Sequence, residues 1–180
     1  MCPHIGIFVT SREYLFAFDD KGNEAWVAEL VGAPLTPAVS NESLDVVAVG
    51  SRDLVQAFSI LSGDESWRKE VNDLSGLTAD WARFYATDRN GLLSSWFMNG
   101  VDAWSSEIPD NAFPAIPSPE NVMIVSQDGN LVNLDSETGE LNYELTFNAK
   151  FSPDLPPFVS GDWLYGRNDN IIGAIAPEEP

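Results

Sequence analysis

The sequence is poor in the residues on which most catalytic and metal-binding sites are built. It contains one cysteine, Cys2, and one histidine, His4. One cysteine excludes an internal disulfide and a cysteine-based metal cluster, and one histidine removes most zinc sites and histidine-based catalysis. The sequence also has no nucleophile elbow, phosphate-binding glycine loop or zinc-protease motif. We therefore expect no catalytic, cofactor-binding or metal-ligating residues, and we predict that the protein is not an enzyme.

Positive charge is equally scarce. Only three of the 180 residues are lysine, and the formal net charge is −19. Nucleic acids and anionic membrane surfaces require a basic binding surface, so the acidic composition argues against both as partners. No apolar run approaches the ~18 residues of a membrane span, and the N-terminal stretch lacks the basic and long apolar regions of an export signal. We therefore expect no direct membrane insertion, and these residues assign no compartment.

The chain does have glycine paired with aromatic residues at a fixed spacing. Three of the six tryptophans follow a glycine by four positions, whereas composition alone predicts about 0.4 such pairs. A tyrosine repeats the spacing once more. The four pairs are Gly22/Trp26, Gly63/Trp67, Gly100/Trp104 and Gly139/Tyr143. Successive pairs are separated by 41, 37 and 39 residues, a period that indicates a repeat protein.

Each repeat contains four short strand patterns. An apolar run, a polar turn and a second apolar run come first, and the glycine turn and a strand with the aromatic residue follow. A connection with proline or glycine then leads to a fourth short strand, such as LTPAVS (35–40) or FPAIPS (113–118). No window shows a helical period, and the prolines gather where they would interrupt a helix. The pattern predicts an antiparallel β-meander that repeats about every forty residues.

A repeating unit of four antiparallel strands is typical of the blades of a β-propeller. A parallel β-helix is the alternative, but its coils are usually shorter and lack this turn. We predict one all-β domain over residues 1–180, with repeat units at about 1–40, 41–80, 81–118 and 119–160 and a partial unit at 161–180. The glycine supplies the positive φ of a tight turn, and the aromatic side chain fills the wedge between two blades. We expect this structural docking role for all four pairs.

Two segments carry a family resemblance. LVNLDSETGELNY (131–143) and LVQAFSILSGDESW (54–67) resemble the tryptophan-docking repeat of quinoprotein-like propellers, the pyrroloquinoline quinone (PQQ) type. The resemblance covers the chain as four repeats and half of a fifth. The glycine turn is one residue shorter in the first and third repeats, and Tyr143 replaces tryptophan in the fourth. The resemblance implies a propeller, but it does not imply one particular chemistry.

Two branches of that family lead to different functions. Quinoprotein dehydrogenases hold PQQ over a calcium ion in the central channel, and no acidic ligand set of this chain can be matched to theirs. Non-catalytic scaffolds, such as the propeller lipoprotein of the bacterial outer-membrane β-barrel assembly machinery, are more similar to residues 30–71. The resemblance implies a scaffold for protein–protein interaction at the periplasm or outer-membrane periphery, with no cofactor. The alternatives are a fragment of a PQQ- and calcium-dependent dehydrogenase and the sensor domain of a larger protein.

The chain is short for such a propeller. Seven or eight blades would require ~280–320 residues, and the chain has 180. With the family's strand order, three full blades (35–71, 76–108 and 113–147) lie between a blade without its first strand and a blade without its last. We expect an incomplete ring of about four to five blades whose open strand edges favour self-association. Such a chain is a fragment or completes its ring by oligomerising; a compact four-blade ring is the alternative.

Arginine marks a second set of turns. Four of the six arginines lie in the predicted turns between the second and third strands of the blades: Arg12, Arg52, Arg89 and Arg167. A row of guanidinium groups can receive carboxylates or a peptide backbone, because each presents several donors in a fixed fork. The alternative is that the neighbouring acids neutralise them, namely Glu13, Asp53, Asp88 and Asp169. We treat the four arginines as a candidate partner-binding rim.

Aromatic residues in the connections between blades extend this rim. Phe113 and Phe151 are candidate exposed anchors for a partner protein, since aromatic side chains dominate interface hot spots. The alternative is that both rings are tucked between blades. Trp81 and Trp163 each follow an aspartate at the start of an apolar run, and we expect both in the core.

Overall fold

The computed structural model describes residues 5–41, 46–147, 150–153, 155–160, 163–168 and 171–175. Every regular element in these ranges is a β-strand, and all strand pairs are antiparallel. No helix that could cross a membrane occurs in this part of the chain. Cys2, His4 and Asp169 lie outside the described residues.

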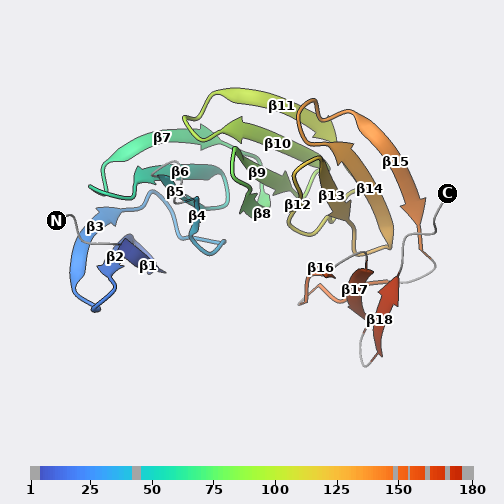
Figure 1. Ribbon diagram of the computed structural model, residues 1–180, viewed down its shortest axis with the longest axis horizontal. Helices are drawn as coiled ribbons and strands as arrows, with labels where there is room; N and C mark the ends of the chain where they lie inside the picture. Colours follow the sequence, from blue (N-terminus) through green and yellow to red (C-terminus); the bar gives the residue numbers. More distant parts are fainter. Residues whose placement is uncertain are drawn as a thin grey trace.

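The strands form five separate sheets, each with its strands paired in chain order (Figure 1). The first sheet contains β1 (Ile5–Thr10), β2 (Tyr14–Asp19) and β3 (Glu24–Glu29). The second contains β4 (Val39–Asn41), β5 (Val46–Gly50), β6 (Leu54–Ser59) and β7 (Glu65–Glu70). The third contains β8 (Leu74–Ala79), β9 (Arg83–Asp88), β10 (Leu92–Phe97) and β11 (Asp102–Glu107). The fourth contains β12 (Ile116–Pro117), β13 (Asn121–Val125), β14 (Asn130–Asp135) and β15 (Leu141–Thr146). The fifth contains β16 (Phe158–Ser160), β17 (Trp163–Asn168) and β18 (Ile171–Ile175).

The sheets stand side by side along an open arc, with the first and fifth sheets at its two ends (Figure 1). Three four-stranded sheets lie between two three-stranded ones, which is the grouping that the strand order predicted. The predicted fold class, an all-β incomplete propeller, is therefore confirmed. The sheets do not close into a compact ring.

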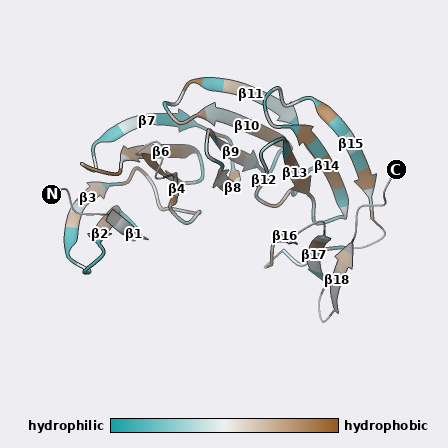
Figure 2. Ribbon diagram, viewed as in Figure 1, coloured by the Kyte–Doolittle hydropathy of each residue, from teal (hydrophilic) through white to brown (hydrophobic). Residues whose placement is uncertain are grey.

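Apolar side chains gather between successive sheets rather than in one centre. Four buried clusters occupy the four spaces between neighbouring sheets. Every residue of β5 is buried because both faces of that strand are covered, whereas the outer strand β7 is mostly exposed. Figure 2 shows the same contrast between hydrophobic β6 and hydrophilic β7. Each sheet is thus stabilised mainly by its two neighbours, as in other repeat proteins.

Proline shortens the inner strands. The inner strands β4, β12 and β16 contain three, two and three residues, and each lies in or directly after a proline-bearing segment. The inner strand β8 has no proline and extends over six residues. Proline has no N–H for the strand ladder, so it is tolerated only at the ends of these strands.

A regular contact joins each sheet to the next. The tryptophans of β3, β7 and β11 each reach the glycine turn of the following sheet. Their indole N–H groups donate to backbone carbonyls there: Trp26 to Ile60 at 2.7 Å, Trp67 to Met98 at 2.8 Å and Trp104 to Ser136 at 3.0 Å. A one-residue β-bulge precedes each of these tryptophans and sets the register of its strand.

The glycine beneath each indole ring is required for two reasons. Gly63 has φ 75° and Gly100 has φ 82°, a region that residues with a Cβ rarely adopt. A Cβ built at Gly63 would lie 2.7 Å from the Trp26 ring, and one at Gly100 would lie 2.7 Å from the Trp67 ring. Gly139 has the same relation to Trp104, at 2.5 Å.

The two ends of the series differ from its middle. A Cβ built at Gly22 would meet no described atom within 4 Å, because no described sheet lies on that side of the first sheet. Tyr143 on β15 follows a bulge like the tryptophans, but its side chain is 43% exposed. The docking contact is therefore made three times in the described chain.

The variants Gly22→Ala and Gly63→Ala distinguish the cost of backbone strain from the cost of losing the docking contact. Their φ values are 81° and 75°, so an alanine at either position is held in the left-handed region. Each substitution should therefore lower the free energy of unfolding by about 1–2 kcal/mol. Only Gly63→Ala also drives a methyl group into an indole ring, and we expect a further loss of about 1–3 kcal/mol. Urea unfolding of both variants measures the difference. Equal losses would contradict the docking role of the glycine.

Candidate protein-binding rims

Turns gather on two opposite rims of the arc, because strands in a meander alternate in direction. We call "docking rim" the glycine turns together with the turns between first and second strands: residues 19–24, 59–65, 79–83, 97–102, 117–121 and 135–141. We call "arginine rim" the turns between second and third strands together with the connections between sheets: residues 10–14, 30–38, 50–54, 71–73, 88–92, 108–115, 125–130, 147, 150–153 and 155–157. Backbone hydrogen bonds from Leu74 N to Arg52 O, 2.8 Å, and from Arg89 N to Asp73 O, 3.1 Å, join turns and connections on this second rim.

Arg52 and Arg89 share one acid on the arginine rim. The Nε atoms lie 3.1 Å and 3.9 Å from the carboxylate oxygens of Asp73, in the connection between the second and third sheets. The two arginine side chains are 72% and 58% exposed. The acids next to them in sequence do not supply these contacts. Asp88 is buried, and its carboxylate accepts hydrogen bonds from the backbone of Asn90 and of Leu92.

The other two arginines lie further along the same series. Arg12 is exposed in the turn between β1 and β2. Arg167 is exposed in β17, and its carbonyl accepts a hydrogen bond from Ser152 N at 2.8 Å. Arg12, Arg52 and Arg89 thus lie in the corresponding turns of the first three sheets, and Arg167 lies near the end of β17 in the fifth sheet. The corresponding turn of the fourth sheet, residues 125–130, has no arginine.

The prediction that Phe113 and Phe151 are exposed anchors is wrong. They are 5% and 8% exposed, and their rings meet edge to face with centroids 6.5 Å apart. Both belong to the apolar cluster between the fourth and fifth sheets, where Gly166 lies directly against the Phe151 ring. Their ring area fills the space between two sheets, so it is unavailable to a partner.

The prediction that Trp81 and Trp163 are core residues is also wrong. Trp81 is 68% exposed and Trp163 is 46% exposed. The Oδ1 atom of Asp80 accepts the N–H groups of Ala82 and Arg83 at 2.6 Å and 2.7 Å. This turn delays the start of β9 to Arg83 and leaves Trp81 outside the strand.

Several large apolar residues are exposed on the docking rim. They are Leu61, Trp81, Phe97 and Val101, with exposed fractions of 61%, 68%, 39% and 55%. Sequence reasoning missed this set, because each residue belongs to an apolar run or adjoins one. The signal that marks Trp81 is the aspartate before it, which favours a turn at that position.

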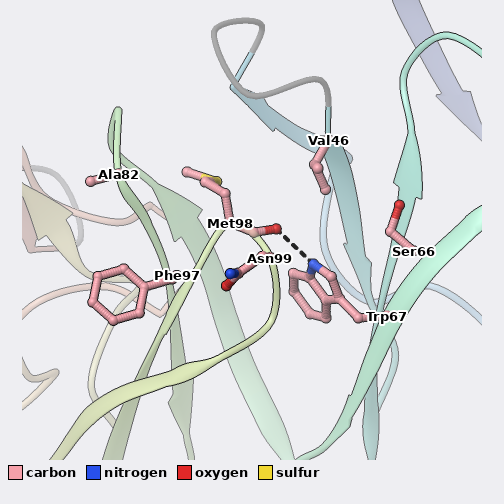
Figure 3. A pocket seen from close by; sticks show the side chains of 7 residues that line it. All are labelled: Val46, Ser66, Trp67, Ala82, Phe97, Met98 and Asn99. Carbon is pink, nitrogen blue, oxygen red and sulfur yellow. Dashed lines mark hydrogen bonds between the residues drawn. The ribbon is translucent and has the colours of Figure 1, made fainter.

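An open pocket of about 570 Å³ lies on this rim between the second and third sheets (Figure 3). It is lined by Val46, Ser66, Trp67, Ala82, Phe97, Met98 and Asn99. Figure 3 shows Phe97 and Trp67 on opposite sides with Asn99 between them. The indole N–H of Trp67 is already bonded to Met98 O, so its ring offers an apolar surface. The Arg83 guanidinium lies 5.2 Å from the centre of the Phe97 ring, which fixes the other side of the pocket.

Polar groups in or next to the turns of the docking rim have structural partners. The carboxylate of Asp135 accepts the N–H groups of Glu137 and Thr138 at 2.9 Å and 2.8 Å, and these backbone bonds lower its pKa. Burial raises the pKa of Tyr85, and its hydroxyl donates to Asp80 at 2.8 Å, which raises the pKa further. No group of three or more His, Cys, Asp or Glu side chains suited to a metal ion occurs among the described residues.

No protein-family model and no curated protein match the sequence. Solved structures match the fold. BamB from Moraxella catarrhalis has a TM-score of 0.74 and 17% identity, over 91% of this chain and 54% of that one. The computationally designed Ika8 protein has a TM-score of 0.71 and 13% identity, over 96% of this chain and 58% of that one. The designed Ika4 protein has a TM-score of 0.69 and 14% identity, over 83% of this chain and 96% of that one. The chain thus has the fold of a BamB-like propeller and spans just over half the length of BamB and Ika8.

The shared acid on the arginine rim can be tested against a matched control. Asp73 and Asn111 occupy corresponding connections with φ 54° and 53°, so alanine strains both positions alike. Asp73→Ala also removes a partner of two arginines, and exposed ion pairs contribute about 0–1 kcal/mol. At low salt, we expect Asp73→Ala to lower the free energy of unfolding by up to about 1 kcal/mol more than Asn111→Ala does. In ~1 M salt, the two substitutions should lower it by equal amounts, because the ion pairs are screened. A difference in urea unfolding that persists at high salt would rule out the ion pairs as its cause.

Proposed function

We propose that the protein is a non-enzymatic propeller scaffold that binds other proteins through its docking rim. The observation that carries this proposal is the apolar pocket between the second and third sheets, with exposed Phe97 on one side. Exposed Trp81 directly precedes Ala82, which also lines the pocket. Aromatic residues around a concave apolar site are typical anchors for a partner protein.

The pocket suits an extended apolar segment. It is open to solvent at the rim and is lined mainly by apolar side chains from two sheets. Asn99 and Ser66 provide polar groups in the lining, and they can form hydrogen bonds with the backbone of a peptide whose apolar side chains enter the pocket. An extended chain with alternating apolar side chains therefore fits better than a compact polar surface.

Outer-membrane protein assembly is the process in which we propose that the scaffold acts, at the periplasm or outer-membrane periphery. Two observations support it: the resemblance of residues 30–71 to scaffold propellers of that machinery, and the likeness of the fold to BamB. Strands that span the outer membrane alternate apolar and polar residues and carry aromatic residues near their ends. Such strands, before insertion, are extended apolar segments of the kind that the pocket suits.

A synthetic peptide of about ten residues with this alternating pattern tests the proposal. We expect saturable binding by fluorescence anisotropy. Trp81→Ala and Phe97→Ala should each raise the dissociation constant about tenfold or more, because truncated hot-spot aromatics cost about 2 kcal/mol. Leu61→Ala, at a position exposed on the same rim that neither lines the pocket nor adjoins a lining residue in sequence, should leave binding unchanged. A peptide with the same composition in scrambled order serves as the ligand control.

Absence of saturable binding, or equal binding by all three variants, would contradict the pocket as the binding site.

The same titration addresses the arginine rim, which we propose as a second contact surface for acidic partner segments. A variant with all four arginines changed to glutamine should bind the apolar peptide normally and lose affinity for a Glu-rich peptide. Saturable binding of PQQ with calcium in calorimetry would instead favour the dehydrogenase alternative.

A further inference from the structure

The first sheet carries an apolar face that nothing in the described chain covers. Leu15, Ala17 and Trp26 are buried against the second sheet, so alternation along the strands turns their neighbours to the opposite face. That face holds Ile7, Val9, Tyr14, Phe16, Phe18 and Val27. Strand pairing places Ile7 opposite Phe18, and Val9, Phe16 and Val27 in one row. The six side chains form a continuous surface.

The same positions of the second sheet form a buried interface. Val47 and Phe58 pair as Ile7 and Phe18 do, and they are 0% and 2% exposed against the first sheet. Ile7, by contrast, is 52% exposed. The empty space beside Gly22 lies on this side of the first sheet as well. An interface of this kind joins each pair of neighbouring sheets in the described chain, and the first sheet presents one unpaired half of it.

The fifth sheet presents the opposite half. Leu164 is buried against the fourth sheet, so alternation turns Trp163 and Tyr165 away from it. Phe158 stacks on Tyr165 with ring centroids 5.2 Å apart, and it is 60% exposed. The corresponding pair in the fourth sheet packs against the apolar cluster shared with the fifth: Ile116 and Met123.

We propose that two copies of this chain associate head to tail, with the first sheet of each copy against the fifth sheet of the other. The two exposed faces are complementary halves of one repeated interface, and they lie at opposite ends of an open arc (Figure 1). One chain cannot bring them together, whereas two chains join both pairs and close a ring. The chain covers 54% of BamB and 58% of Ika8, so the parts that are missing, 46% and 42%, are somewhat smaller than a second arc, and two arcs form a slightly larger ring.

The charge of the chain sets a condition on this contact. Each copy carries a net charge of −19, so two copies repel each other at low salt. Screening reduces the repulsion and leaves the apolar contact intact. The dimer should therefore become tighter as salt concentration rises. The surfaces involved differ from the docking and arginine rims, so this inference goes beyond the proposed function.

Light scattering of the purified chain in ~0.5 M salt tests the inference. The expected mass is twice the 19.7 kDa of one chain. Ile7→Asp disrupts one face and Phe158→Asp disrupts the other. For each variant alone, the dissociation constant of the dimer should be at least tenfold higher than for the wild type. Val101→Asp, at a 55% exposed position of the third sheet, is the matched control and should remain dimeric. Val27→Asp replaces Ile7→Asp if circular dichroism shows that the latter is misfolded.

Mixing the two variants distinguishes head-to-tail contact from general stickiness. Each mixed pair retains one intact contact, between the unmodified first sheet of one copy and the unmodified fifth sheet of the other. At a protein concentration where each variant alone is monomeric, an equimolar mixture should therefore form a 1:1 dimer. A monomeric wild type at all protein and salt concentrations would overturn the inference, as would a single variant that stays dimeric. Peptide binding at the docking rim is measured on the same samples, so failure of this inference is distinguishable from failure of the proposed function.

Discussion

The arc depends on the contact between the indole ring of one sheet and the glycine turn of the next. It combines a buried hydrogen bond from the indole N–H, a glycine that leaves room for the ring, and a bulge that sets the strand register. The apolar clusters between sheets depend on the spacing that these contacts define. Because each sheet depends mainly on its neighbours, the structure extends by repetition, and its ends are left as incomplete interfaces.

Much of the fold could be predicted because its main determinants are local. Glycine, asparagine and proline mark the strand ends, and the glycine–aromatic spacing marks the repeats, so the grouping into three full and two partial sheets followed from strand order. The burial of single side chains could not be predicted. Trp81 is exposed because an aspartate turn delays the start of β9 by two residues, and periodicity does not resolve a shift of that size. The contacts of Asp73 join arginines from turns 37 residues apart, and only the assembled sheets bring them together.

The repeat determines which surfaces pack against neighbouring sheets and which are available to partners. The faces of the sheets are committed to packing, so variation is tolerated chiefly in the turns, where partner-binding residues of scaffolds concentrate. The docking rim and the arginine rim lie on opposite sides of the arc and differ in chemistry. The docking rim exposes apolar and aromatic side chains, whereas the arginine rim exposes arginines interspersed with acids. A protein that is acidic as a whole can therefore still present two distinct local surfaces to its partners.

Hydrogen exchange of the indole N–H groups tests the central claim most directly, because it reports on each tryptophan separately. The account predicts slow exchange for Trp26, Trp67 and Trp104, whose N–H groups are bonded to the following sheet. It predicts fast exchange for the exposed indoles of Trp81 and Trp163. Fast exchange at all five, or protection of Trp81 equal to that of Trp67, would contradict an arc whose sheets are joined by indole rings.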